Sequence, residues 1–138
     1  MTTELNLDYA EARRAIDAIM AEVSLRGKAA VIVVADSRGE LIALARMDGA
    51  PFSSITVASN KAFTAARAGK PSFDVGTKVR HPEHGFDISY YGDPRFCGWG
   101  GGVPLKKDGK VVGAVAVSGL PQEEDMEIVQ IGVAAAGF

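Results

Sequence analysis

The stretch AAVIVVADSRGELIALARMD, residues 29–48, decides the fold of this chain. Residues 29–36 are a continuous run of β-branched and small apolar residues, which is typical of a strand covered on both faces. Ser-Arg-Gly at 37–39 predicts a turn, and residues 40–48 read as the returning strand of a hairpin. We therefore expect a central, doubly covered strand with its hairpin partner beside it.

A second hairpin is predicted near the C-terminus, at residues 102–119. The Asp108-Gly109 dipeptide favours a tight turn between two apolar runs, and Gly113 indicates a bulge or a close backbone contact. Helical periodicity predicts helices over 7–26, 53–68 and 120–138, with a short one over 72–80. Ser53 or Ser54 is a candidate N-cap for the second helix. Two hairpins with intervening helices predict an α+β fold, a layered single domain over 1–138 with an antiparallel sheet.

Composition and charge limit the classes of function. The chain has 138 residues, is 47% hydrophobic and carries a net charge of -2, so no basic surface points to a nucleic-acid partner. No stretch approaches ~18 uncharged apolar residues, so we expect no membrane span. One cysteine excludes an internal disulfide, and the N-terminal residues do not resemble a signal peptide. These features predict a cytoplasmic protein.

The glycine run within FCGWGGGVPL, residues 96–105, is a candidate binding loop. Neither nucleotide fingerprint fits, since Val103 occupies the last glycine position of G-x-G-x-x-G and Pro71 follows Gly-Lys where a P-loop needs Ser or Thr. Two interpretations stay open: a tight turn into a strand, or glycines at 101 and 102 whose exposed amides let a ligand or another stretch of backbone come very close.

Two histidines, His81 and His84, lie in the irregular segment 81–102, which is rich in aromatic residues. They are candidate ligands for a divalent metal or for haem iron. The alternative is a pair of surface histidines, with His81 capping a turn that begins at Pro82. We expect the segment to be packed against its own domain or a partner subunit, because it is too aromatic for disorder.

Several other side chains have both a functional and a structural interpretation. Tyr91, Arg95 and Trp99 form a pocket or interface wall, or else pack into the core. Lys61 is conspicuous if its helix face is buried, and otherwise reaches solvent. The plain interpretation of Arg46 and Asp48 is an exposed ion pair, and that of Cys97 is a buried, unreactive thiol.

Ser118 and Gly119 precede the last predicted helix, whose N-terminal amides favour an anion. This junction is therefore a candidate anion-binding site.

Three signatures carry a resemblance to a known family. They are Arg-Met-Asp-Gly-Ala at 46–50, Lys61-Ala62, and the run from Gly101-Gly102-Val103-Pro104 to Ser118-Gly119. The chain resembles the haem-binding uptake and glycolate-operon family of the HbpS and GlcG type, and the C-terminal domain of PduO-type proteins is similar. The resemblance implies a profilin-like antiparallel sheet of about five strands with flanking helices, and a homo-oligomer of tetramer to octamer size. Residues 85–102 are longer and more aromatic than the family pattern.

The first functional hypothesis is a binding protein for haem or a small anionic or aromatic carboxylate, in a pocket lined by the 81–102 loop. Its candidate ligand-binding residues are Arg46, Lys61, His81, Tyr91, Arg95, Trp99, Gly101, Gly102, Ser118 and Gly119. The alternative is a cofactor-independent or metal-assisted hydratase, isomerase or lyase acting on a small organic acid. There His84 or Asp48 would move the proton. A third hypothesis is a structural oligomer without a ligand.

Overall fold

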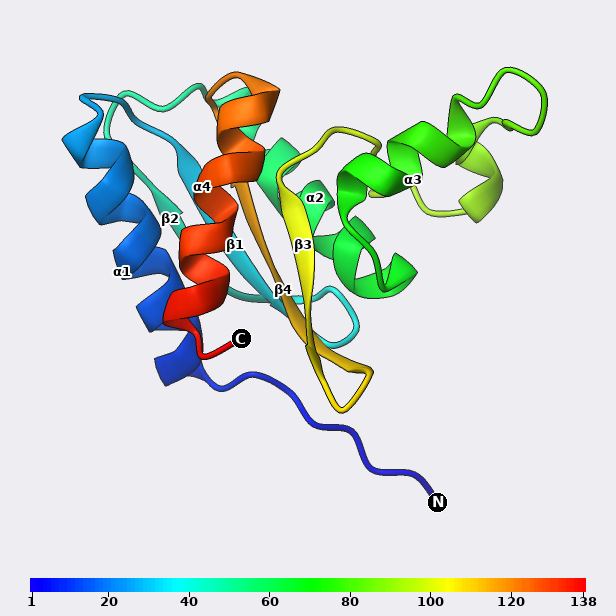
Figure 1. Ribbon diagram of the computed structural model, residues 1–138, viewed down its shortest axis with the longest axis horizontal. Coiled ribbons are helices and arrows are strands. Elements are labelled where there is room, and N and C mark those ends of the chain that lie inside the picture. The colour runs from blue at the N-terminus through cyan, green and yellow to red at the C-terminus, as the bar shows by residue number, and fades with distance from the viewer.

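One antiparallel sheet of four strands, in the order β2-β1-β4-β3, forms the centre of the molecule (Figure 1). The computed structural model describes all 138 residues. The strands are β1 (Val31–Asp36), β2 (Leu41–Arg46), β3 (Gly102–Lys107) and β4 (Lys110–Ser118). Both predicted hairpins are confirmed, but the expectation of about five strands is wrong. The two hairpins supply every strand, because the segment between them forms helices and turns.

Helices cover both faces of the sheet, as the continuous apolar run of β1 requires. They are α1 (Tyr9–Leu25), α2 (Ser53–Ala68), α3 (Ser72–Val79) and α4 (Gln122–Ala135), with a 3-10 helix η1 (Ile88–Tyr91). Helices α1 and α4 lie together on one face and α2 lies on the other (Figure 1). None of these helices combines the length and apolar character needed to cross a membrane.

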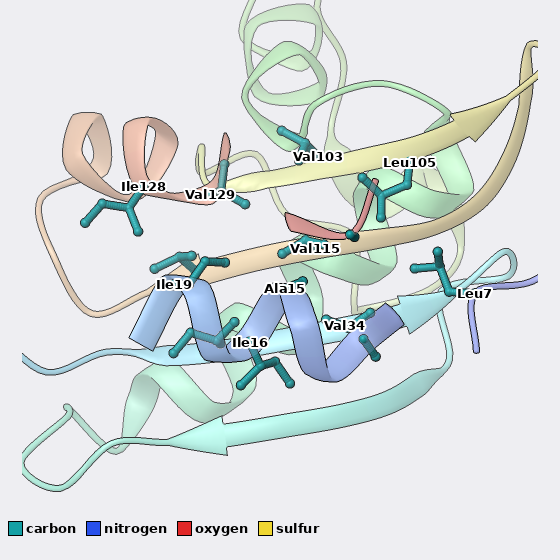
Figure 2. Packing of buried hydrophobic residues seen from close by; sticks show 14 of the residues in the cluster. Leu7, Ala15, Ile16, Ile19, Val34, Val103, Leu105, Val115, Ile128 and Val129 are labelled. Carbon is teal, nitrogen blue, oxygen red and sulfur yellow. The ribbon is translucent and has the colours of Figure 1, made fainter. Parts of the chain in front are cut away.

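The face under α1 and α4 is built from large aliphatic side chains. Ile16 and Ile19 of α1 meet Ile128 and Val129 of α4 over the sheet residues Val34 and Val115 (Figure 2). The last helix lacks a long side chain at Gly132, where an added Cβ would overlap the side chain of Ile19. This layer is a sealed hydrophobic core.

The face under α2 is built from small side chains instead. Ala58, Ala62, Ala65 and Ala66 of α2 pack on sheet residues that include Val31, Val33, Ala114 and Ala116. Small residues on both surfaces let the backbone of α2 approach the sheet closely. Lys61, on this same helix, is also buried.

Local signals set most element boundaries. Asp108 and Gly109 both have positive φ, at 53° and 77°, as a two-residue hairpin turn of this type requires. The predicted close contact at Gly113 is confirmed, because an added Cβ there would lie 2.7 Å from the carbonyl oxygen of Ala35. The predicted serine cap of α2 is wrong: Phe52 occupies the N-cap position, and no side chain caps the helix.

Residues 72–99, here called the arm, project from the body beside β3 (Figure 1). The arm contains α3, the turn with the two histidines, η1 and the loop that returns to the sheet. An aromatic ladder attaches it to α2. Tyr91 stacks on Phe96 with ring centroids 4.3 Å apart, and Phe96 meets the edge of Phe63 at 5.1 Å. The expectation that this segment is packed rather than disordered is confirmed.

Candidate functional site: a cleft over a buried ion pair

A cleft of about 290 Å³ opens where α2 begins and β4 passes into α4. Four of the candidate residues line it: Lys61, Trp99, Ser118 and Gly119. The other lining residues are Pro51, Ser53, Ser54, Val57, Leu120, Gln122 and Asp125. The cleft therefore brings together parts of the chain that lie far apart in the sequence.

A buried ion pair forms the floor of the cleft. Nζ of Lys61 donates to Oδ2 of Asp125 at 3.1 Å and to the carbonyl oxygen of Val117 at 2.9 Å. Both charged side chains are only 3% exposed. The backbone N–H of Leu120 donates to the other oxygen, Oδ1, of Asp125 at 3.2 Å. Lys61 thus joins α2 to α4 through the end of the sheet and does not reach solvent.

Burial raises the pKa of Asp125 to about 6, although Lys61 acts in the opposite direction. The shift arises because the carboxylate has lost most of its contact with water. Asp125 is therefore a carboxyl group that changes charge near neutral pH at the floor of a cleft.

The glycine run leaves the space through which the side chain of Lys61 reaches Asp125. A Cβ on Gly101 would lie 2.9 Å from Nζ of Lys61 and 2.6 Å from the carbonyl oxygen of Val117. A Cβ on Gly102 would overlap the carbonyl oxygen of Lys61. Gly101 also has a φ of 124°, which L side chains rarely adopt. The glycines are required by packing, and this favours the close-approach interpretation over a simple turn.

The amides on either side of Gly101 already have partners within the chain. The N–H of Gly100 donates to Oε1 of Gln122 at 2.8 Å, and that of Gly102 donates to Oγ of Ser72 at 3.0 Å. Gly101 and Gly102 line a separate hollow of about 140 Å³ on the other side of the run. The amide of Gly102 is therefore already used within the chain, and ligand binding by Gly101 stays a prediction.

The rim of the cleft offers unused hydrogen-bonding groups. Ser54 and Ser118 are each only 5% exposed, line the cleft and make no side-chain hydrogen bond within the chain. Ser54 also lies in the first turn of α2, which has neither a side-chain cap nor an acidic residue there. The N–H groups of Ser54 and Ile55 donate to the carbonyl oxygens of Pro51 and Phe52, so this helix N-terminus contributes its partial positive charge rather than free amide donors. This rim is suited to an anion.

The remaining charged candidates lie outside the cleft. Arg46 and Asp48 are exposed near the end of β2 and form no ion pair with each other. The guanidinium of Arg46 lies over the ring of Phe52 instead, 5.6 Å from its centroid. Arg95 packs 3.9 Å over the ring of Phe63 and pairs with Asp93 and Glu40, so its charge is used to hold the arm.

The two histidines lie on the exposed turn of the arm, with ring centroids 5.0 Å apart. Nδ1 of His81 accepts the backbone N–H groups of Glu83 and His84, as expected for a residue that caps the turn after Pro82. No group of three or more His, Cys, Asp or Glu side chains is placed to hold a metal ion. The pair therefore has no third protein ligand beside it.

A third hollow, which we call the groove, lies on the arm beside Trp99. It measures about 460 Å³ and is lined by Val79, Arg80, Phe86, Ile88, Phe96, Cys97, Gly98 and Trp99. Burial raises the pKa of the Cys97 thiol, and no histidine lines the groove. This surrounding disfavours a reactive thiolate.

Sequence reasoning missed Ser54 as a lining residue, along with Gln122 and Asp125. Asp125 belongs to an acidic helix start, a pattern that indicates only a favourable interaction with the helix dipole. The position of Ser54 at the start of a helix predicts only a cap. No local signal distinguishes either residue from its neighbours, because their roles depend on Lys61 and on β4.

The model of a family described as "Haem degrading protein HbpS-like" matches residues 7–134. The chain belongs to the HbpS-like family. It is 30% identical over 119 residues to an uncharacterised 15.0 kDa protein in the dhaT-dhaS intergenic region of Citrobacter freundii, covering 86% of this chain and 84% of that protein. It is 31% identical over 118 residues to protein GlcG of Escherichia coli K12, covering 86% and 85%.

Solved structures share the fold. The Klebsiella pneumoniae protein ORFY superposes with a TM-score of 0.92 at 25% identity, covering 99% of this chain and 94% of that one. A PduOC:heme complex superposes with a TM-score of 0.88 at 24% identity, covering 95% of each chain. The resemblance to HbpS, GlcG and PduO-type proteins is confirmed.

Proposed function

We propose that this protein binds a small carboxylate-bearing molecule in the cleft above Lys61 and Asp125. The observation that carries the proposal is the pair of cleft-lining hydroxyls of Ser54, in the uncapped first turn of α2, and Ser118, at the end of β4, neither of which makes a side-chain hydrogen bond within the chain. A bound carboxylate would accept a hydrogen bond from each hydroxyl, and a hydrogen bond to a charged group typically contributes ~1.5–3 kcal/mol.

Trp99 supplies the apolar side of the site. Trp99 lines the cleft and is 60% exposed, so its indole ring is open to a ligand. A flat ligand group placed against the indole ring would remove apolar area from both partners. The cleft is therefore suited to an acid with a planar apolar group, although Trp99 is the only residue of the 81–102 loop that lines it.

Haem is the ligand that the PduOC:heme structure suggests. The residues lining the cleft include no His, Cys, Met or Tyr, which are the side chains that hold haem iron. His81 and His84 lie on the arm, and Nδ1 of His81 is already used as an acceptor. The cleft therefore does not fit iron-ligated haem.

The sole tryptophan gives a direct test, because Trp99 is the only source of indole fluorescence. We expect its emission to change saturably on titration with benzoate and with other aromatic carboxylates, and to stay constant with the uncharged analogue benzamide. Calorimetry supplies the affinity. The proposal fails if none of these acids binds at concentrations up to the millimolar range, or if benzamide binds equally well.

A matched pair of serine variants locates the site. Ser54→Ala should weaken benzoate binding about tenfold, since a hydrogen bond to a charged group contributes ~1.5–3 kcal/mol. Ser59→Ala, on the same helix but outside the cleft, removes a hydroxyl that bonds to the carbonyl of Ile55 and should leave the affinity unchanged. Equal effects of the two variants would place the ligand elsewhere.

One observation favours the enzyme alternative. Asp125, whose pKa is raised to about 6 by burial, touches the cleft and could take or give a proton near neutral pH. Proton transfer at the carbon beside the ligand's carboxylate would appear as deuterium exchange by NMR in D2O. Exchange in the wild type that Asp125→Asn abolishes, without loss of binding, would support catalysis. A proton-transfer role for His84 or Asp48 stays a prediction.

Oligomeric state and location also stay predictions. We propose a homo-oligomer of tetramer to octamer size in the cytoplasm, on the strength of the family and the sequence. Light scattering on the purified protein tests the oligomeric state, and cell fractionation tests the location.

A further inference from the structure

Trp99 is the wall common to two hollows. It lines the cleft above the ion pair and also the apolar groove on the arm. The cleft is the smaller of the two, at about 290 Å³ against about 460 Å³ for the groove. Sites for small organic ligands usually measure ~300–1,000 Å³. The cleft falls just short of that range and the groove lies within it, and Trp99 is the one residue that lines both.

The groove is lined mainly by apolar side chains, as many sites for small organic ligands are. Phe86, Ile88 and Phe96 leave apolar surface open there, beside the exposed ring of Trp99. Scattered apolar residues are common on a surface, but a continuous apolar hollow next to a polar cleft indicates an amphipathic ligand.

Arg80 adds a charge without a partner. Its guanidinium lines the groove, forms no ion pair or hydrogen bond in the chain, and lies over the close contact between Gly76 and Gly98. An added Cβ on Gly98 would come within 3.1 Å of Nη1 of Arg80. Arg26, Arg38 and Arg95 are paired with carboxylates, whereas Arg80, like Arg14 and Arg46, is not. An arginine beside an apolar groove is suited to stacking on a flat ring or to a second acidic group.

We infer that one ligand occupies both hollows, with its carboxylate in the cleft and a flat, fused-ring body crossing Trp99 into the groove. The inference rests on the proposed function of the cleft and specifies its ligand class. Single-ring acids would fill the cleft only. Extended aromatic acids would also cover the groove and place their far edge near Arg80.

Calorimetry with two probe acids tests this. Pyrene-1-carboxylate should bind at least tenfold more tightly than benzoate, because the larger ring system buries more apolar area. Ile88→Asn, in the groove, should lower the ratio of the two affinities at least fivefold. Tyr90→Asn is the matched control, since Tyr90 lies on the same 3-10 helix, is 80% exposed and does not line the groove. It should leave the ratio unchanged.

Each outcome separates this inference from the proposed function. If neither acid binds, the proposed function fails and the inference fails with it. If benzoate binds but pyrene-1-carboxylate binds no more tightly, or Ile88→Asn leaves the ratio unchanged, only the inference is overturned. It is also overturned if uncharged pyrenemethanol binds as well as the acid, or if Ile88→Asn changes the oligomeric mass, because the groove would then be a contact between copies.

Discussion

The two faces of the sheet differ in the size of the side chains that pack on them. Beneath α1 and α4, large residues such as Ile19, Ile32 and Ile128 fill the space between layers. Beneath α2, alanines and glycines bring backbones together and leave a lysine buried among them. The first face stabilises the fold through side-chain volume. The second positions polar groups at the end of the sheet, and that is where the cleft lies.

The ion pair between the two faces should give the largest effect. Asp125→Ala leaves the Lys61 ammonium buried without a carboxylate, which we expect to cost about 4 kcal/mol of unfolding free energy. Urea denaturation measures the change. Glu123→Ala, which removes an exposed acid from the same helix, should cost less than about 0.5 kcal/mol. Similar losses in the two variants would show that the pair has no special role.

Shortening a large side chain in the core under α1 and α4 should give the second-largest loss of stability. Ile128→Ala removes a fully buried side chain between α4 and α1 and should lower the unfolding free energy by about 3–4 kcal/mol. Ile128→Val, which removes one methyl group, should cost about 1 kcal/mol. If the alanine variant lost less than about 1 kcal/mol of unfolding free energy, the neighbouring side chains would have moved to fill the space left by Ile128.

The charge of Asp125 makes stability depend on pH. Its pKa rises from 3.8 to about 6 on folding, with Lys61 and Glu124 as its charged neighbours, so the folded chain retains a proton that the unfolded chain has released. This group's contribution to stability is therefore complete below about pH 4, falls as the pH rises to about 6, and is constant above. The difference is at most about 3 kcal/mol.

Unfolding free energies of the wild type and Asp125→Asn, measured between pH 4 and pH 7, isolate this effect. The wild type should lose stability relative to the variant as the pH rises through that interval. A constant difference between the two proteins would show that Asp125 titrates normally in the folded state.

Adding a methyl group to a glycine that packs against α2 should give the smallest of these losses of stability. Gly102→Ala places a methyl group against the backbone of Lys61, which cannot move independently, and should cost about 2 kcal/mol. Gly100→Ala is the control: its methyl group would meet the flexible side chain of Met126, 2.5 Å from Sδ, and should cost less than about 1 kcal/mol. Thermal denaturation would rank the two, and the reverse order would contradict the backbone approach described above.

The fold was largely predictable because its signals are local. The β-branched run at 31–36, the Asp108-Gly109 turn and the helical periodicities each depend on neighbouring residues, and the structure places elements close to those positions. The fifth strand was a feature of the family resemblance and had no counterpart in the chain's own pattern.

The site was only partly predictable. Trp99, Ser118 and Gly119 were found from composition and from their place before a helix, and all three line the cleft. Tyr91 and Arg95 looked equally functional, but they hold the arm against α2. An aromatic-basic cluster has the same sequence pattern in either role, so its contacts alone distinguish the two.

The sequence by itself determined the order of the elements, the doubly covered central strand and the absence of a nucleotide loop in FCGWGGGVPL. Tertiary structure decided what those glycines are for. They let Lys61 reach Asp125, a residue 64 positions further along the chain, between the two layers. Such a contact leaves no local trace, because neither a buried lysine nor its carboxylate differs in sequence pattern from solvated charges until the helices pack around them.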